Sequence, residues 1–121
     1  MPDQSRTARG RWGEERAAAH LQRSGYDIVD RNWRSPERGL GGELDIVAVE
    51  PASDLLVFVE VKARRSGRHG GAVAAVGEAK QERIRRLAES WLRQCERRFD
   101  GVRFDVIAID GVRLRHWPAA F

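Results

Sequence analysis

The sequence predicts an α/β fold in which helices flank a buried central sheet. Residues 43–50 and 55–63 are rich in Val, Ile, Leu and Phe on both faces, and a turn-forming segment separates them. Strands that are apolar on both faces usually lie in the middle of a sheet. Residues 78–97 repeat apolar side chains at helical spacing, which predicts a helix that packs one face on that sheet. The length suits one core, so we expect a single domain over residues 1–121.

The other elements follow in chain order. Residues 1–8 are typical of a loose tail, and residues 9–24 predict a helix that ends at Gly25. Alternating apolar residues predict three further strands, at residues 26–33, 102–110 and 112–117. Within the second of these, Asp105 could face either the core or an end of the sheet.

Each predicted helix has an inner stripe at helical spacing. In the first helix the stripe comprises Glu14, Ala17, Ala18 and Leu21. In the second it comprises Ile84, Leu87, Ala88, Trp91, Leu92 and Cys95, and we expect Trp91 and Cys95 to lie in the core. On its outer face, Glu82–Arg86 and Glu89–Arg93 have the spacing of favourable ion pairs.

Charge and composition narrow the partners and the location. With 22 basic and 18 acidic residues the net charge is +4, and the sequence pI is about 10.2. This balance favours a polyanionic partner, nucleic acid first, although many basic proteins bind none. No apolar run approaches the roughly 20 residues of a membrane span, and the first residues lack a signal-peptide core. The single cysteine, Cys95, excludes an internal disulfide, so we expect a cytoplasmic protein.

The central hairpin places charges inside an apolar environment. A turn centred between Ala52 and Ser53 pairs Asp45 with Glu60, with Cβ atoms about 4.5–5.5 Å apart on one face. Lys62, two residues further on, projects from that same face. A slip of one residue would instead put the two carboxylates on opposite faces.

Two adjacent carboxylates in a sheet repel each other, and a hard cation removes that penalty. Asp45 and Glu60 would hold Mg²⁺ or Mn²⁺, with the backbone carbonyl of Val61 as a further ligand. Such a metal polarises a phosphate oxygen and activates water, while Lys62 orients that water or neutralises the growing charge. Glu14 either joins this site or only stabilises its helix N-terminus. The alternative for the whole group is an internal Glu60–Lys62 pair with Asp45 capping a turn.

Several polar residues are candidates for nucleic-acid contacts. Lys occurs only at positions 62 and 80, and Lys80 either reaches the site from the first turn of the second helix or is solvated. Residues 31–34 combine cations, an amide and an aromatic ring, a mixture suited to phosphates and bases or, alternatively, to a solvated edge strand. The candidates outside the acidic site are Arg31, Asn32, Arg34, Arg64, Arg65, Arg68 and Lys80.

These motifs resemble the YraN-like family of small bacterial proteins. The similarity rests on GE at residues 13–14, RNWR at 31–34, GELDIV at 42–47, VFVEVKAR at 57–64, Lys80, RFDV at 103–106 and AF at 120–121. Members of this family are regarded as predicted endonucleases of the PD-(D/E)xK superfamily. Their core is similar to that of archaeal Holliday-junction resolvases. Leu44 stands where the superfamily name has proline.

The resemblance implies a restriction-endonuclease-like core of mixed sheet and flanking helices, in the order α-β-β-β-α-β. It implies metal binding by Asp45 and Glu60, Lys62 as the catalytic lysine, and Glu14 in the place of the resolvases' helix glutamate. It also implies a homodimer.

We therefore expect a metal-dependent endonuclease that hydrolyses DNA, with branched or structured DNA as a candidate substrate. Two alternatives remain at this point. One is a non-catalytic nucleic-acid-binding module on a nuclease fold, and the other is a protein-interaction subunit whose basic surface serves acidic partners.

Overall fold

The computed structural model describes residues 4–64 and 76–121, with side chains over residues 10–63 and 76–121. Its elements are helix α1 (Gln4–Arg23), strands β1 (Asp27–Trp33), β2 (Leu44–Glu50) and β3 (Leu55–Arg64), helix α2 (Glu78–Gln94), and strands β4 (Gly101–Asp110) and β5 (Arg113–Trp117). This order contains the predicted α-β-β-β-α-β series, followed by one more strand.

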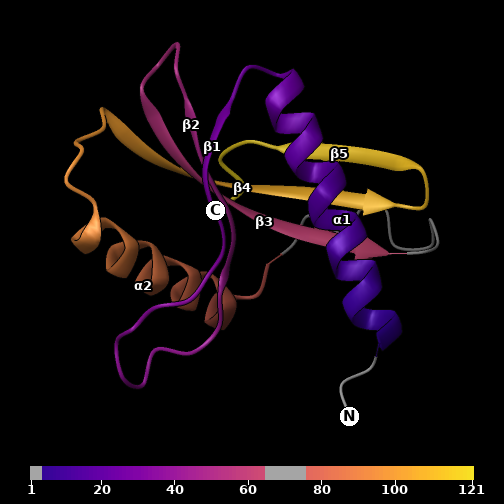
Figure 1. The fold of residues 1–121 in the computed structure, drawn as a ribbon, viewed down its shortest axis with the longest axis horizontal. Coiled ribbons are helices and arrows are strands. Elements are labelled where there is room, and N and C mark those ends of the chain that lie inside the picture. The colour runs from indigo at the N-terminus through magenta and orange to yellow at the C-terminus, as the bar shows by residue number, and fades with distance from the viewer. Residues whose placement is uncertain (1–3, 65–75) are drawn as a thin grey trace.

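The five strands form one mixed sheet in the order β1-β2-β3-β4-β5 (Figure 1). β3 and β4 are parallel, and the other three neighbouring pairs are antiparallel. A parallel pair needs a crossover connection, and here that connection contains α2. The predicted α/β architecture is therefore confirmed, and it is compatible with a restriction-endonuclease-like core.

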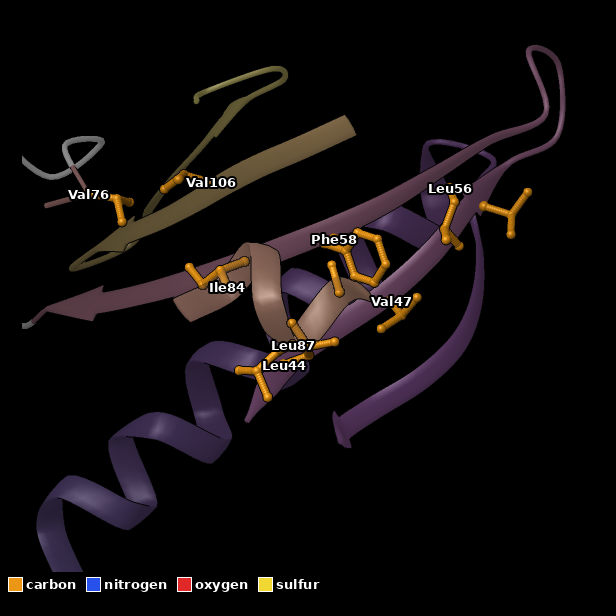
Figure 2. Packing of buried hydrophobic residues seen from close by; sticks show 10 residues of the cluster. Leu44, Val47, Leu56, Phe58, Val76, Ile84, Leu87 and Val106 are labelled. Carbon is orange, nitrogen blue, oxygen red and sulfur yellow. The ribbon is translucent and has the colours of Figure 1, made fainter. Parts of the chain in front are cut away.

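Two hydrophobic clusters cover the two faces of the sheet. Ile84, Leu87 and Ala88 of α2 pack on one face, against residues that include Phe58 of β3 (Figure 2). Ala17, Ala18 and Leu21 of α1 pack on the other face, against Val57, Val59, Ile107 and Ile109 among others. β3 contributes to both clusters because successive side chains of a strand point to opposite faces. The predicted inner stripes of both helices are thus confirmed at these six positions.

Gly13 sets how closely α1 approaches the sheet. A Cβ built at Gly13 would lie 2.6 Å from the Cβ of Ala63 on β3, a distance that real Cβ atoms do not show. Only glycine therefore allows the helix backbone to cross β3 at this level. The adjacent residue, Glu14, is brought to the border of the sheet as a result.

Some boundaries differ from the prediction. α1 begins at Gln4 rather than at residue 9, because the segment from Gln4 onward consists mainly of residues compatible with a helix. α2 ends at Gln94 rather than at residue 97, because Cys95 takes an extended conformation and its N–H caps the carbonyl of Leu92.

Two details of α2 depart from expectation. Trp91 is half-buried but packs against the core as predicted, whereas Cys95 is half-buried and lies just after the helix. The Trp91 indole donates to Asp30 at 3.0 Å, so its polar edge needs a position beside β1. Arg93 pairs with Glu37 of the β1–β2 loop instead of the predicted Glu89.

The ion pair expected between Glu82 and Arg86 is confirmed at 2.8 Å. Over the described residues, no helix combines the length and the apolar character that crossing a bilayer requires.

Candidate functional site

The register of the β2–β3 hairpin matches the prediction. Ile46 pairs with Val59, and the pairing continues toward the turn as far as Glu50 and Leu55. Asp45 and Glu60 are the next two positions beyond Ile46 and Val59. Here the Asp45 Oδ2 accepts the backbone N–H of Val61 at 2.8 Å. The one-residue slip is thereby excluded, and the two carboxylates line one cavity.

That cavity has a volume of about 190 Å³ and lies between the start of β2, the last part of β3 and the first turns of α2. Its lining residues are Gly42, Glu43, Asp45, Glu60, Lys80, Arg83, Ile84 and Leu87. The apolar part of this wall, Ile84 and Leu87, belongs to the core on the α2 side.

Glu14 joins this site from α1. One carboxylate oxygen each from Glu14, Glu43 and Asp45 lie within 4.8 Å of one another, a separation at which one cation can contact all three. Glu14 thus lies beside Glu43 and Asp45, and it stands in the middle of α1 rather than in its first turn. Glu43 was not among the predicted site residues, although an acid two positions before Asp45 was a signal for it.

Asn32 connects two of these carboxylates. Its amide nitrogen donates to Glu14 Oε2 at 2.7 Å and to Glu43 Oε1 at 3.3 Å. The Asn32 backbone has φ of +48°, a left-handed conformation that asparagine tolerates better than most residues. Sequence reasoning assigned Asn32 to nucleic-acid contact, whereas in the structure its side chain positions the acidic group.

Asp45 is the most perturbed acid of the group. Burial first, and then the negative charge of Glu60, raise the pKa of Asp45 to about 8, with a smaller contribution from Glu14. The Val61 N–H and the Lys80 ammonium act in the opposite direction but do not compensate. A carboxyl group in this position favours its protonated form unless a positive charge is added beside it.

Glu60 is paired with Lys80. The side chain of Glu60 is 8% exposed, and its Oε1 lies 2.6 Å from the Lys80 Nζ. Lys80 thus reaches the acidic cavity, while about half of its side chain stays exposed to solvent. Lys62 follows Glu60 by two residues on β3 and is half-buried.

The other residues predicted to contact nucleic acid either lie near carboxylates or fall outside the residues that the structure describes. Arg31 contacts Glu15 at 2.8 Å, and Arg34 contacts Glu43 at 3.3 Å. Arg65 and Arg68 lie outside the described residues, as does the side chain of Arg64. Sequence reasoning also missed Arg83, which lines the cavity one turn after Lys80 on the same helix. Its spacing from Lys80 was the available signal.

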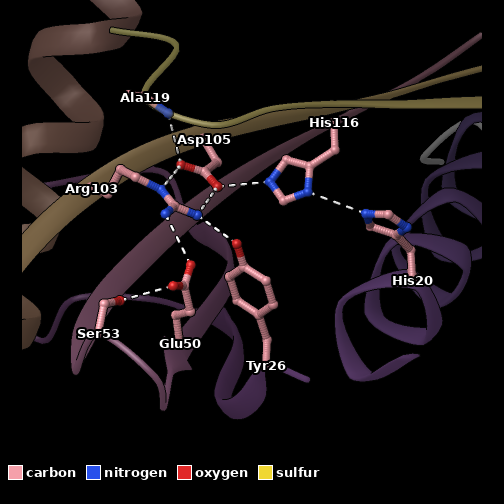
Figure 3. A network of polar contacts seen from close by, with 8 residues as sticks. All are labelled: His20, Tyr26, Glu50, Ser53, Arg103, Asp105, His116 and Ala119. Atoms are coloured by element: carbon pink, nitrogen blue, oxygen red, sulfur yellow. Dashed lines mark hydrogen bonds and ion pairs between the residues drawn. The ribbon is translucent and has the colours of Figure 1, made fainter. Parts of the chain in front are cut away.

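A second polar network surrounds Asp105 of β4 and includes His116 of β5 and His20 of α1 (Figure 3). Asp105 is fully buried and accepts bonds from Arg103, His116 and the Ala119 backbone N–H. Burial alone would raise the pKa of Asp105, but these hydrogen bonds hold it below its ordinary value. Of the two positions left open for Asp105, the structure shows the core.

The rest of this network ties the sheet to its surroundings. Arg103 also binds Glu50 at 3.1 Å and the Tyr26 hydroxyl at 2.6 Å. His116 lies 3.1 Å from His20 of α1. None of the residues drawn in Figure 3 is among those that line the acidic cavity.

Comparisons with known proteins give the family. The model of the uncharacterised protein family UPF0102 matches residues 13–109. A UPF0102 protein of Syntrophotalea carbinolica is 48% identical over 122 aligned residues, which cover 96% of this chain and 93% of that protein. One from Rhodococcus opacus is 50% identical over 102 residues, covering 84% of this chain and 81% of that protein. A UPF0102 protein of Frankia alni is 44% identical over 126 aligned residues, and the alignment covers 100% of both chains. The chain thus belongs to the uncharacterised protein family UPF0102, the YraN-like family that its motifs resemble.

Proposed function

We propose that this protein is a metal-dependent endonuclease of the PD-(D/E)xK type that hydrolyses DNA phosphodiester bonds. The observation that carries the proposal is the partly buried Asp45, whose carboxylate lies with those of Glu14 and Glu43 inside 4.8 Å. A protein gains no stability from such a cluster of like charges, which is why a ligand of opposite charge is the best explanation.

The residues of the cavity fit a hard divalent cation. All the side-chain donors are carboxylate oxygens, the ligand type that Mg²⁺ and Mn²⁺ prefer. Asp45 and Glu60 would hold the ion, Glu14 and Glu43 would bind directly or through water, and Val61 would offer its carbonyl. When bound, the metal supplies a Lewis acid for the phosphate and a water of lowered pKa.

The chain's own groups would have distinct tasks. Asp45 must lose its proton before it can bind a cation, and its raised pKa links binding to proton release. Asn32 holds Glu14 and Glu43 in place through its amide. We assign Lys62 the task of orienting the attacking water or neutralising the charge that grows on the phosphate.

Net charge supports DNA as the substrate. The chain carries +4 overall although its cavity gathers carboxylates, so the residues outside that cavity carry a net positive charge. Branched or structured DNA, a homodimer and a cytoplasmic location belong to this proposal through the family resemblance. Light scattering during size-exclusion chromatography tests the homodimer.

The experiment is a cleavage assay on labelled single strands, duplexes, flaps and four-way junctions, each with EDTA, Mg²⁺ or Mn²⁺. Asp45→Asn, Glu60→Gln and Lys62→Ala should each lower metal-dependent cleavage by at least about tenfold, as expected for groups that bind or orient a metal ligand. Glu89→Gln, an exposed change on the outer face of α2, is the matched control and should cleave like the wild type. Cleavage that survives both carboxylate changes would contradict the proposal.

One observation favours a second candidate, a nucleic-acid-binding module without catalysis. Lys80 already neutralises Glu60 at 2.6 Å, which is an arrangement that needs no metal. This alternative predicts salt-dependent DNA binding that EDTA, Asp45→Asn and Glu60→Gln leave unchanged, with no cleavage under any condition.

A further inference from the structure

A larger cavity adjoins the acidic one. It has a volume of about 520 Å³, within the range of about 300–1,000 Å³ typical of small-molecule sites. It lies between the β1–β2 loop and the first turns of α2, and we call it the glycine groove. Its lining residues are Gly39, Leu40, Gly41, Gly42, Ala79, Glu82, Arg83 and Arg86. Gly42 and Arg83 also line the acidic cavity, so the two cavities meet at these residues.

Glycines keep the loop wall of this groove bare. A Cβ added at Gly41 would meet no atom within 4 Å, so the backbone there faces open space. Gly42 has φ of +89°, and a Cβ there would lie 3.1 Å from the Cδ of Arg83. A glycine at this position therefore lets the Arg83 side chain lie across the loop. A wall without side chains admits a bulky, flat or charged ligand close to the backbone.

Arg83 places a guanidinium group where the two cavities meet. Arg86, the other arginine of the groove, is paired with Glu82 at 2.8 Å. Arg83 makes no ion pair or side-chain hydrogen bond within the part of the chain that the structure describes. A guanidinium held beside bare backbone is suited to a phosphate, which it can bind through two parallel N–H bonds.

We propose that the glycine groove binds one strand of DNA, with a nucleotide in the groove and its phosphate on Arg83. The phosphate on Arg83 would then adjoin the phosphodiester at the acidic cavity, since Arg83 lines both cavities. The inference rests on the proposed function for the position of the cleaved bond, but the binding itself is tested without cleavage.

The test is fluorescence anisotropy of a labelled single-stranded oligonucleotide in EDTA, so that no cleavage occurs. Arg83→Met removes the charge and keeps the length of the side chain, and it should weaken binding at least about tenfold. For a single strand, losing one phosphate contact should also reduce the slope of log K against log salt by about 0.7. Arg98→Met, an exposed residue after α2, removes the same charge and should change affinity less than about twofold.

A second variant fills the groove without removing charge. Gly41→Leu places a side chain in open space, so its melting temperature should match that of the wild type while its affinity falls at least about fivefold. Ala52→Leu, in the exposed turn between β2 and β3, is the control and should bind normally. Normal binding by both Arg83→Met and Gly41→Leu, or no binding by the wild type at low salt, would overturn the inference.

The inference and the proposed function fail separately. If the wild type cleaves DNA with metal and the groove variants bind normally, the inference about the groove is wrong and the proposed nuclease activity stands. If the groove variants lose binding and the wild type cleaves no DNA with any metal, the proposed nuclease activity is wrong and the inference about the groove stands.

Discussion

Lys80 Nζ lies 2.6 Å from Glu60 Oε1 and thereby joins the first turn of α2 to the last part of β3. The two residues are unequal in exposure, since Glu60 is 8% exposed and Lys80 about half exposed. The pair therefore serves chiefly the buried carboxylate. Removing the lysine takes this counter-charge away from Glu60, which lies next to Asp45.

Lys80→Met should destabilise the metal-free protein by about 1–2 kcal/mol, less than a fully buried pair because Lys80 is partly solvated. Arg86→Met, which breaks an exposed pair on the same helix, should cost only about 0.3–0.5 kcal/mol. Urea unfolding in EDTA measures both. Equal losses in the two variants would show that the Lys80 pair behaves as an ordinary surface pair.

Asp45→Asn should stabilise the metal-free protein at pH 8 and above. The folded protein holds the Asp45 proton more tightly than the unfolded chain, since its pKa is raised from near 4 to about 8. Stability should therefore fall as the pH rises from about 4 to about 8, because the folded state must ionise a group it prefers protonated. Asparagine never ionises, and its carbonyl can still accept the Val61 N–H.

Thermal unfolding in EDTA from pH 5 to pH 9 measures this effect. We expect Asp45→Asn to raise the Tm by about 4 °C or more at pH 9 and to remove the part of the pH dependence that comes from Asp45. Asp27→Asn, an exposed change on β1, is the control. A lower Tm for Asp45→Asn at pH 9 would mean that the charged form of Asp45 is the one the fold favours.

Two substitutions of Asn32 should separate the role of its amide in the acidic site from the role of its backbone conformation in stability. Asn32→Gly keeps the left-handed conformation and removes the amide, so it should weaken Mn²⁺ binding by about 10- to 100-fold with little loss of stability. Asn32→Ala removes the same amide and adds about 1–2 kcal/mol of backbone strain. Isothermal titration with Mn²⁺ and urea unfolding distinguish the two effects. Unchanged Mn²⁺ affinity in both variants would show that metal binding does not need the hydrogen bonds from Asn32 to Glu14 and Glu43.

Gly13→Ala should destabilise the fold by about 1–3 kcal/mol, because its Cβ would lie 2.6 Å from the Ala63 Cβ and α1 would have to move. Gly10→Ala adds the same methyl group in the same helix with no atom within 4 Å, and it should stabilise by about 0.5–1 kcal/mol. The double variant Gly13→Ala with Ala63→Gly should recover stability. Without that recovery in urea unfolding, the close contact with Ala63 would not be the cause.

The contribution of His20 to stability should fall as the pH drops below about 6.5, which is opposite in sign to the contribution of Asp45. Burial, with contributions from His116 and Arg23, lowers the pKa of His20, so the unfolded chain takes up the proton at a higher pH than the folded protein does. The contribution of His20 to the free energy of unfolding is therefore fully present above its pKa in the unfolded chain. It is lost as the pH falls through its pKa in the folded protein. His20→Gln should flatten the Tm profile between pH 6.5 and pH 5. An unchanged profile would point to another titrating group.

Local patterns in the sequence were sufficient for the elements and for half of the candidate site. The β2–β3 register follows from the centre of a short turn, so Asp45 could be placed opposite Glu60 from neighbouring residues alone. The inner stripe of α2 follows from helical spacing in the same way, except at its end, where Cys95 leaves the helix. These features depend on interactions between residues that are close in sequence.

Only the tertiary structure decided how distant segments complete the site. Glu14, Asn32 and Glu43 come from α1, β1 and the residue before β2, and their contacts depend on how closely Gly13 lets the helix cross β3. The ion pair of Lys80, the burial of Asp105 and the meeting of two cavities at Arg83 likewise depend on packing between elements. The physical reason is that periodicity specifies which face a side chain occupies, whereas its partner on another element depends on the distance at which the elements pack.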